Sequence, residues 1–204
     1  MSVYFGATAV GVRARDGVVL ATDRRMSYGG FIVSRTIRKV YVFEDRVAIA
    51  FAGLYGDMGG LYRILEAELK YYQATSGSKL SVKAIAKRLS TILYAYKPIP
   101  FYVEAILGGM EGDTPILYAL DPLGSVTEDA YIAAGSGATI ALGVLEAEYS
   151  EGINVEKAEQ LAIRAVKASI ERDAMTGDGI DIATITSKGA KQKTITIKTT
   201  ITTE

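Results

Sequence analysis

The segment GATAVG at residues 6–11, followed by DGVVLATDRR at residues 16–25, decides the fold of this chain. Both segments contain an apolar run with strand-like character, and the pair Asp16-Gly17 is a typical hairpin turn. The sequence therefore predicts two antiparallel strands close to the amino terminus. Thr8 lies at the start of the first strand, directly after a short leader.

The placement of Thr8 indicates a particular chemistry. If the leader is removed, a new α-amine lies beside a hydroxyl group on the same residue or on its neighbour. This is the arrangement of an N-terminal nucleophile hydrolase, in which the amine acts as the general base for the hydroxyl. The sequence leaves open whether Ala7 or Thr8 becomes the terminal residue.

The composition restricts any catalysis to hydroxyl, amine and carboxylate groups. The 204-residue chain contains no cysteine and no histidine. This excludes disulfides, thiolate catalysis, Ser-His-Asp triads and metal sites built from those residues. We expect neither a bound metal nor a cofactor.

Charge and hydropathy narrow the class of protein further. Basic and acidic residues both number 23, so the net charge gives no indication of a nucleic-acid partner. The leader lacks the features of a secretory signal, and no segment approaches the length of a membrane span. We therefore expect a cytoplasmic protein without membrane association. Asparagine and glutamine are scarce, which fits a thermophile.

The order of hydrophobic periodicities predicts one layered α+β domain. Apolar runs predict strands over residues 8–14, 18–23, 38–43, 46–52, 102–110, 116–121, 125–128, 130–134, 180–186 and 193–197. Helical spacing predicts helices over residues 57–74, 81–98, 139–150 and 155–174. This order suits a four-layer αββα sandwich, in which two antiparallel sheets are flanked by helices on both outer faces. We expect a leader at residues 1–7 and a single domain over residues 8–204.

Several segments together resemble one family, the β-type subunits of the archaeal proteasome core particle. They are the leader followed by TAVG, DGVVLATDRR at 16–25, AGLYGD at 52–57, GSG at 135–137, GVLE at 143–146 and Arg172-Asp173. The resemblance covers almost the whole chain and implies the N-terminal nucleophile hydrolase fold. It also implies threonine-type peptide hydrolysis after autocatalytic removal of the leader. The α-type subunits carry a long helical extension, so a chain that begins almost directly with the strand favours the β type.

The resemblance implies the members of an active site: Thr8, Asp23, Lys39, Ser136, Asp173 and Thr176, with the backbone N–H of Gly53 as oxyanion hole. Asp23 matches the carboxylate that orients a catalytic lysine, and Lys39 matches that lysine. Ser136 and Asp173 match the pair that supports the terminal amine. Thr176 keeps a hydroxyl where the family usually has a serine.

Substrate contacts follow from the same resemblance. Ser27 and Gly53 would hold the substrate backbone as an added strand. The first specificity pocket would be lined by Met26, Ile37, Phe51 and Tyr55, and it would prefer apolar residues before the cleaved bond.

These residues also have ordinary structural explanations. Asp23 and Lys39 on neighbouring strands would make a common type of ion pair, and GSG at 135–137 is a common turn. Asp173 at a helix end would serve as a cap, and Met26 and Phe51 are typical core residues. Only the joint match supports the functional interpretation.

The register of the first strand raises a specific question. Counting from Val10-Gly11 places the family's terminal threonine on Ala7, with Thr8 one residue later. In one hypothesis, cleavage after Ala7 makes Thr8 the nucleophile, which requires a bulge because a one-residue slip turns a strand side chain to the opposite face. In the other, the chain is a non-catalytic β subunit, and another β-type chain supplies the active threonine. A deliberate Thr-to-Ala replacement at position 7 would give the same sequence.

The resemblance implies partners as well. They are α-type subunits, other β-type subunits in stacked seven-membered rings, a regulatory ATPase that acts indirectly, and unfolded protein substrates. The threonine-rich tail over residues 194–204 alternates like an edge strand, so we expect it either to pair across a subunit boundary or to fray. No glycine loop has the P-loop spacing, which disfavours a phosphate-binding module.

Overall fold

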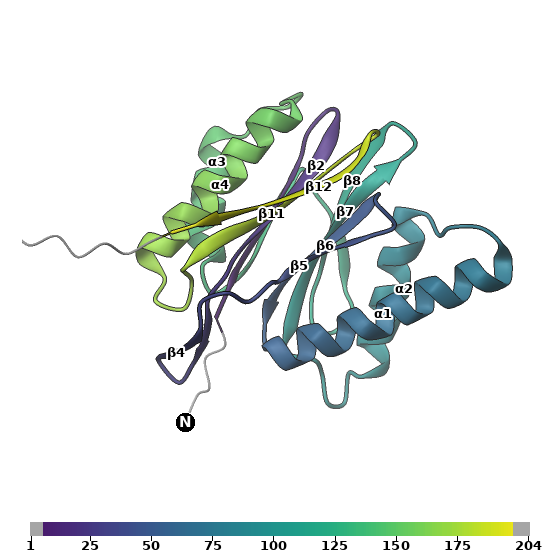
Figure 1. Cartoon of the computed structure of the whole chain (residues 1–204), viewed down its shortest axis with the longest axis horizontal. Coiled ribbons are helices and arrows are strands. Elements are labelled where there is room, and N and C mark those ends of the chain that lie inside the picture. The colour runs from purple at the N-terminus through teal and green to yellow at the C-terminus, as the bar shows by residue number, and fades with distance from the viewer. Residues whose placement is uncertain (1–5, 198–204) are drawn as a thin grey trace, which may run out of the picture.

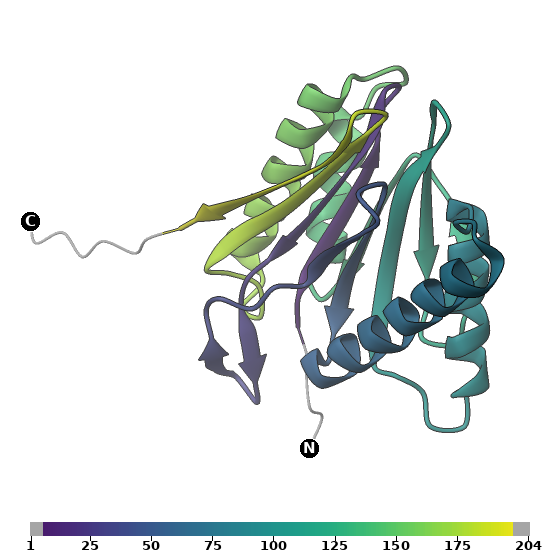
Figure 2. The same ribbon diagram turned by 45° about the vertical axis from the view of Figure 1, so that its right-hand side comes forward.

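Two five-stranded antiparallel sheets lie face to face in the computed structural model, which describes residues 6–197 (Figure 1). The first sheet contains β1 (Thr8–Arg13), β2 (Gly17–Asp23), β10 (Tyr131–Gly135), β11 (Gly179–Thr186) and β12 (Gly189–Thr196). The second contains β5 (Val40–Phe43), β6 (Val47–Gly53), β7 (Val103–Glu111), β8 (Thr114–Leu120) and β9 (Val126–Glu128). The strand orders are β10-β1-β2-β11-β12 and β5-β6-β7-β8-β9. Figure 2 shows the two sheets as separate layers.

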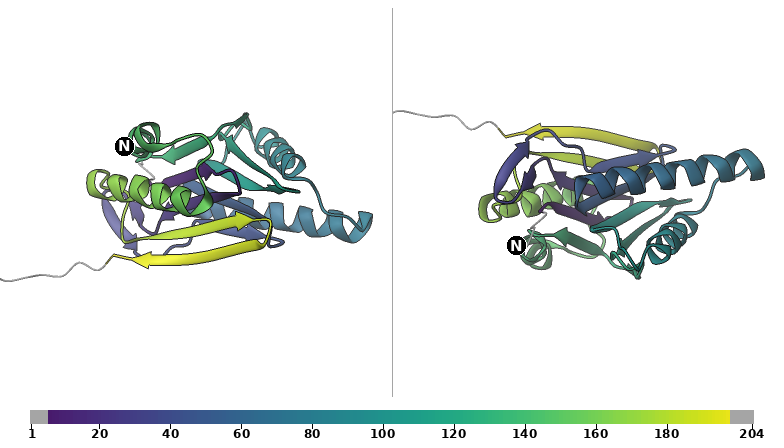
Figure 3. Two further views of the ribbon diagram at one scale, coloured as in Figure 1. Left: turned by 90° about the horizontal axis from the view of Figure 1, so that it is seen from above. Right: turned by 90° about the horizontal axis from the view of Figure 1, so that it is seen from below.

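Helices form the two outer layers (Figure 3). α1 (Tyr55–Ser76) and α2 (Val82–Ala95) cover the second sheet, whereas α3 (Ala138–Glu148) and α4 (Val155–Arg172) cover the first. Two of these helices begin at side-chain caps: Ser81 accepts a hydrogen bond from the backbone N–H of Ala84, and Asn154 accepts one from Lys157. The four layers confirm the predicted αββα sandwich.

Three clusters of buried apolar side chains fill the spaces between the layers. One lies under α1 and α2, one under α3 and α4, and one between the two sheets. The alternation of β1 divides its residues between two of them. Ala7 and Ala9 belong to the cluster between the sheets, whereas Val10 and Val12 belong to the cluster under α3 and α4. Thr8 shares the face of Val10, because successive strand residues point to opposite faces.

A short hairpin at the edge of the molecule was missing from the sequence prediction. β3 (Met26–Tyr28) pairs with β4 (Phe31–Ser34), and Gly29 and Gly30 form the turn with positive φ angles of 56° and 85°. These strands have only three and four residues, and Phe31 is largely exposed. A segment this short, without a buried face, produces little hydrophobic alternation.

Other boundaries differ by a few residues. β12 begins at Gly189 and not at residue 193, and it pairs with β11 along its whole length. Its first four residues, GAKQ, form no apolar run, so the sequence pattern did not indicate a strand there. The expected tail strand over residues 194–204 lies largely outside the described residues. None of the helices formed by residues 6–197 is long and apolar enough to cross a membrane.

Candidate functional site

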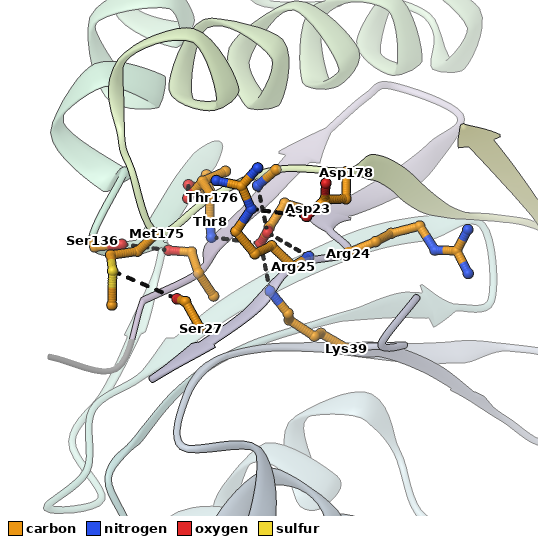
Figure 4. A network of polar contacts seen from close by, with 12 residues as sticks. Thr8, Asp23, Arg24, Arg25, Ser27, Lys39, Ser136, Met175, Thr176 and Asp178 are labelled. Carbon is orange, nitrogen blue, oxygen red and sulfur yellow. Dashed lines mark hydrogen bonds and ion pairs between the residues drawn. The ribbon is translucent and has the colours of Figure 1, made fainter. Parts of the chain in front are cut away.

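Asp23, the last residue of β2, is the centre of a buried polar network (Figure 4). Its Oδ1 accepts hydrogen bonds from Lys39 Nζ at 2.6 Å and from the backbone N–H of Thr8 at 3.0 Å. Its Oδ2 accepts hydrogen bonds from the backbone N–H groups of Arg25 and Gly177, at 3.0 and 2.9 Å. Because four donors from four chain segments converge on one carboxylate, the orientation of Asp23 is fixed.

Lys39 lies at the entrance to β5 and is almost completely buried. Its side chain is 3% exposed, and the carboxylate it contacts is fully buried. A charge pair at this depth requires both partners, since removal of one leaves an uncompensated charge in a medium of low polarity. The structure thus contains the predicted ion pair between Asp23 and Lys39. Three backbone N–H groups also donate hydrogen bonds to the buried Asp23 carboxylate.

A second group of polar side chains comes from the loop after β10 and the loop after α4. Ser136 Oγ donates to Asp173 Oδ2 at 2.5 Å and lies 3.4 Å from the carbonyl oxygen of Ala7. Thr176 Oγ1 also donates to Asp173 Oδ2, at 2.6 Å. The structure thus brings Ser136, Asp173 and Thr176 together beside the start of β1, as the resemblance implied.

Thr8 and Ala7 point in opposite directions. The hydroxyl of Thr8 lies 2.8 Å from that of Thr176, and a Cβ added to Gly137 would lie 2.1 Å from Thr8 Oγ1. Ala7 packs in the apolar cluster between the sheets, and both residues are fully buried. Among residues 6–197, the Thr8 hydroxyl makes no hydrogen bond with Lys39.

The residue before Ala7 is enclosed as well. A Cβ on Gly6 would lie 1.9 Å from Met175 Cβ and 2.8 Å from Ser136 Oγ. The sulfur of Met175 in turn accepts a hydrogen bond from Ser27 Oγ at 3.5 Å, a contact drawn in Figure 4. Ser27, expected to hold substrate backbone, is thus engaged with Met175. Sequence reasoning did not identify Met175.

A small cavity of about 20 Å³ lies where the specificity pocket was expected. Its lining residues are Arg25, Met26, Ser27, Tyr28, Ile37, Lys39, Gly53, Leu54, Tyr55 and Met58. Phe51 is not among them, because it is fully buried in the cluster under α1 and α2. Leu54 and Met58 were missed, although Met58 follows Tyr55 at helical spacing at the start of α1.

Gly53 meets a steric requirement at this cavity. Its φ angle is 131°, and an added Cβ would lie 2.1 Å from the carbonyl oxygen of Tyr102. Only glycine accepts both the positive φ and the close approach of the neighbouring strand. The turn from β6 into α1 therefore depends on this residue.

An arginine pair holds the loop that carries Thr176. Arg25 Nε donates to Asp178 Oδ2 at 2.8 Å, its guanidinium also contacts the carbonyl of Ala174, and Arg35 binds the other oxygen of Asp178. Burial alone would raise the pKa of the Asp178 carboxyl. The hydrogen bonds and charges of Arg25 and Arg35 outweigh burial and hold that pKa below its ordinary value. No group of three or more acidic residues within residues 6–197 is arranged to hold a metal ion.

The layered fold and the position of this network define a class of protein. Two antiparallel sheets lie between helix layers, and a strand begins at a buried Asp–Lys pair beside a glycine turn. This combination is that of an N-terminal nucleophile hydrolase fold.

Comparison with known proteins specifies the family. The model of the family described as proteasome subunit matches residues 3–185. Proteasome subunit beta 1 of Hyperthermus butylicus is 52% identical over 197 residues, which cover 94% of this chain and 97% of that protein. Proteasome subunit beta 1 of Desulfurococcus amylolyticus is 43% identical over 198 residues, with 97% and 98% covered. The chain belongs to the proteasome subunit family, as a β-type member, and such subunits assemble in rings of α-type and β-type chains.

Proposed function

We propose that this chain is a non-catalytic β subunit, which forms the ring and the chamber wall while another β-type chain supplies the active threonine. Proteasome β subunits hydrolyse peptide bonds as parts of an assembled complex. The observation that carries the proposal is the direction of two neighbouring side chains. Ala7, which has no hydroxyl, occupies the face between the sheets, and Thr8 points to the opposite face.

The pairing of β1 argues against a repositioned Thr8. Thr8 pairs with Gly135, and Ala9 pairs with Ala134 and Thr22, in an unbroken antiparallel register. The bulge that would turn the Thr8 hydroxyl toward Lys39 is not found in this part of the strand. The backbone N–H of Thr8 donates to Asp23 Oδ1, which holds the main chain of Thr8 in this register.

The remaining machinery is that of a site built around position 7. Asp23 would orient Lys39, Ser136 and Asp173 would support a terminal amine, and Gly53 would supply the oxyanion N–H. In this subunit the residues before Ala7 would stay attached, because Ala7 has no hydroxyl with which to cleave the bond that precedes it.

In the assembled particle we propose stacked seven-membered rings of α-type and β-type chains in the cytoplasm. A regulatory ATPase would deliver unfolded proteins to the chamber. Peptide-bond hydrolysis there would be independent of ATP and would take place at the threonine of the second β-type chain.

Intact-mass measurement of the co-assembled particle tests the proposal. The particle is treated with a threonine-directed electrophile, and the mass of each subunit is then determined. We expect this chain to keep the residues before Thr8 and to remain unlabelled, while the other β-type chain is shortened and labelled. Loss of residues 1–7 together with an adduct on Thr8 would establish Thr8 as the nucleophile and refute the proposal.

A further inference from the structure

An interaction between the two sheets anchors the loop beside Ala7. β10 is an edge strand of the first sheet, so its outward backbone N–H groups have no partner strand among residues 6–197. The N–H of Gly135 donates instead to Glu104 Oε2, at 2.6 Å. Glu104 lies on β7 of the second sheet, opposite Ala52, whose side chain belongs to the cluster between the sheets. The carboxylate therefore crosses from one sheet to the other.

Gly135 is in direct contact with the main chain at the nucleophile position. Its φ angle is 93°, and an added Cβ would lie 2.1 Å from the carbonyl oxygen of Ala7 and 2.7 Å from Ala52 Cβ. The next residue is Ser136, whose hydroxyl binds Asp173, and the one after it is Gly137, which packs on the Thr8 hydroxyl. Residues 135–137 thus fold around the Ala7–Thr8 peptide bond, and the position of Gly135 sets where this loop begins.

We propose that Glu104 is a positioning residue of this site. Its carboxylate accepts the hydrogen bond from the Gly135 N–H and so fixes the start of the loop over residues 135–137. In this way Glu104 sets the position of the Ser136 hydroxyl relative to Asp173 and to the main chain of Ala7. A hydrogen bond to an ionised acceptor is shorter and stronger than one between neutral groups, which suits the 2.6 Å distance. Glu104 contacts neither Ala7 nor Asp173, so it acts through residues 135–137. This role concerns the geometry of the loop and holds whether or not the chain is catalytic.

Amide hydrogen exchange in the assembled particle tests the proposal directly. The variants are Glu104→Ala, which removes the acceptor, and Glu104→Gln, which keeps a neutral one. Asp113→Asn, in the exposed turn between β7 and β8 of the same sheet, is the control. We expect exchange at residues 135–137 to be faster by about tenfold or more in Glu104→Ala, with a smaller increase in Glu104→Gln and none in the control. Unchanged exchange at Gly135 in Glu104→Ala would overturn the proposal, as would an equal increase over the whole of β10 and β7, which would indicate general loosening.

A second measurement separates positioning from stability. In the Ala7→Thr background, peptide hydrolysis should show a lower kcat with Glu104→Ala and little change in KM, while Glu104→Gln restores most of the rate. Equal kcat values with and without Glu104→Ala would also overturn the positioning role. If the Ala7→Thr chain itself has no activity, the proposed register of the site fails, and the exchange experiment still decides the role of Glu104.

Discussion

Replacement of Thr8 by valine separates a structural threonine from a nucleophile. The Thr8 side chain is fully buried, and its only hydrogen-bond partner within the described part of the chain is the Thr176 hydroxyl at 2.8 Å. Valine keeps the branched shape and removes the hydroxyl. Thr176 still donates to Asp173, so the substitution leaves one acceptor unused and no buried donor unpaired.

The expected cost is therefore that of one neutral hydrogen bond, about 1 kcal/mol. For a chain of this size, this cost lowers the unfolding midpoint by about 2–4 °C. Thr22→Val is a matched control, because the Thr22 hydroxyl is also fully buried but has no hydrogen-bond partner among residues 6–197. We expect this control to be neutral or slightly stabilising, since it removes an unsatisfied polar group.

Two assays complete the experiment. Thermal unfolding at matched protein concentration gives the stability difference, and hydrolysis of a fluorogenic peptide by the co-assembled particle gives the activity. We expect Thr8→Val to show a small loss of stability and an unchanged hydrolysis rate. A particle that assembles normally but loses most of its activity would show that the Thr8 hydroxyl takes part in the reaction and is not only structural.

Two other substitutions test the geometry around the site. Gly135→Ala should destabilise the chain by about 2 kcal/mol or more, because the position combines a positive φ with a clash between the new Cβ and the Ala7 carbonyl. Its unfolding midpoint should therefore lie well below that of Thr8→Val, and equal midpoints would contradict this expectation. Asp178→Asn tests the arginine pair, and asparagine also tolerates the left-handed φ of 68° at this position. Because the folded-state pKa of Asp178 is lowered, its carboxylate stabilises the fold above the ordinary pKa of 3.8, and this contribution disappears as the pH falls through the lower folded-state value. The stability difference between Asp178→Asn and the unmodified chain should be largest near neutral pH and vanish in acid. Denaturant unfolding at several pH values measures this difference. A difference that does not change with pH would contradict the role of the Asp178 charge.

The layers of the fold were predictable because their signals are local. The Asp16-Gly17 turn, the alternation of β1 and the helical spacing of α1 and α4 each lie within about twenty residues. The alternation of β1 also predicted that Ala7 and Thr8 face opposite sides. The β3–β4 hairpin escaped prediction because its few residues bury little apolar surface.

Part of the site depends on contacts that no local pattern reveals. Asp23 and Lys39 were found by their place in a family motif, and the structure adds the donors of Arg25 and Gly177 that complete the carboxylate's partners. The bond from Gly135 to Glu104 crosses from one sheet to the other, so it depends on how the sheets are stacked. Phe51, expected in the specificity pocket, does not line the small cavity and is buried under α1 and α2, because an apolar strand residue can face either side of its sheet.

We infer that the site is built around position 7. Substitution of Ala7 by threonine, followed by intact-mass measurement after incubation with a threonine-directed electrophile, tests it most directly. We expect the variant to lose residues 1–6 on assembly and to carry one adduct on the new terminal residue, while the unmodified chain does neither. An unprocessed and unlabelled variant in a correctly assembled ring would contradict the claim, and so would an adduct on Thr8 of the unmodified chain.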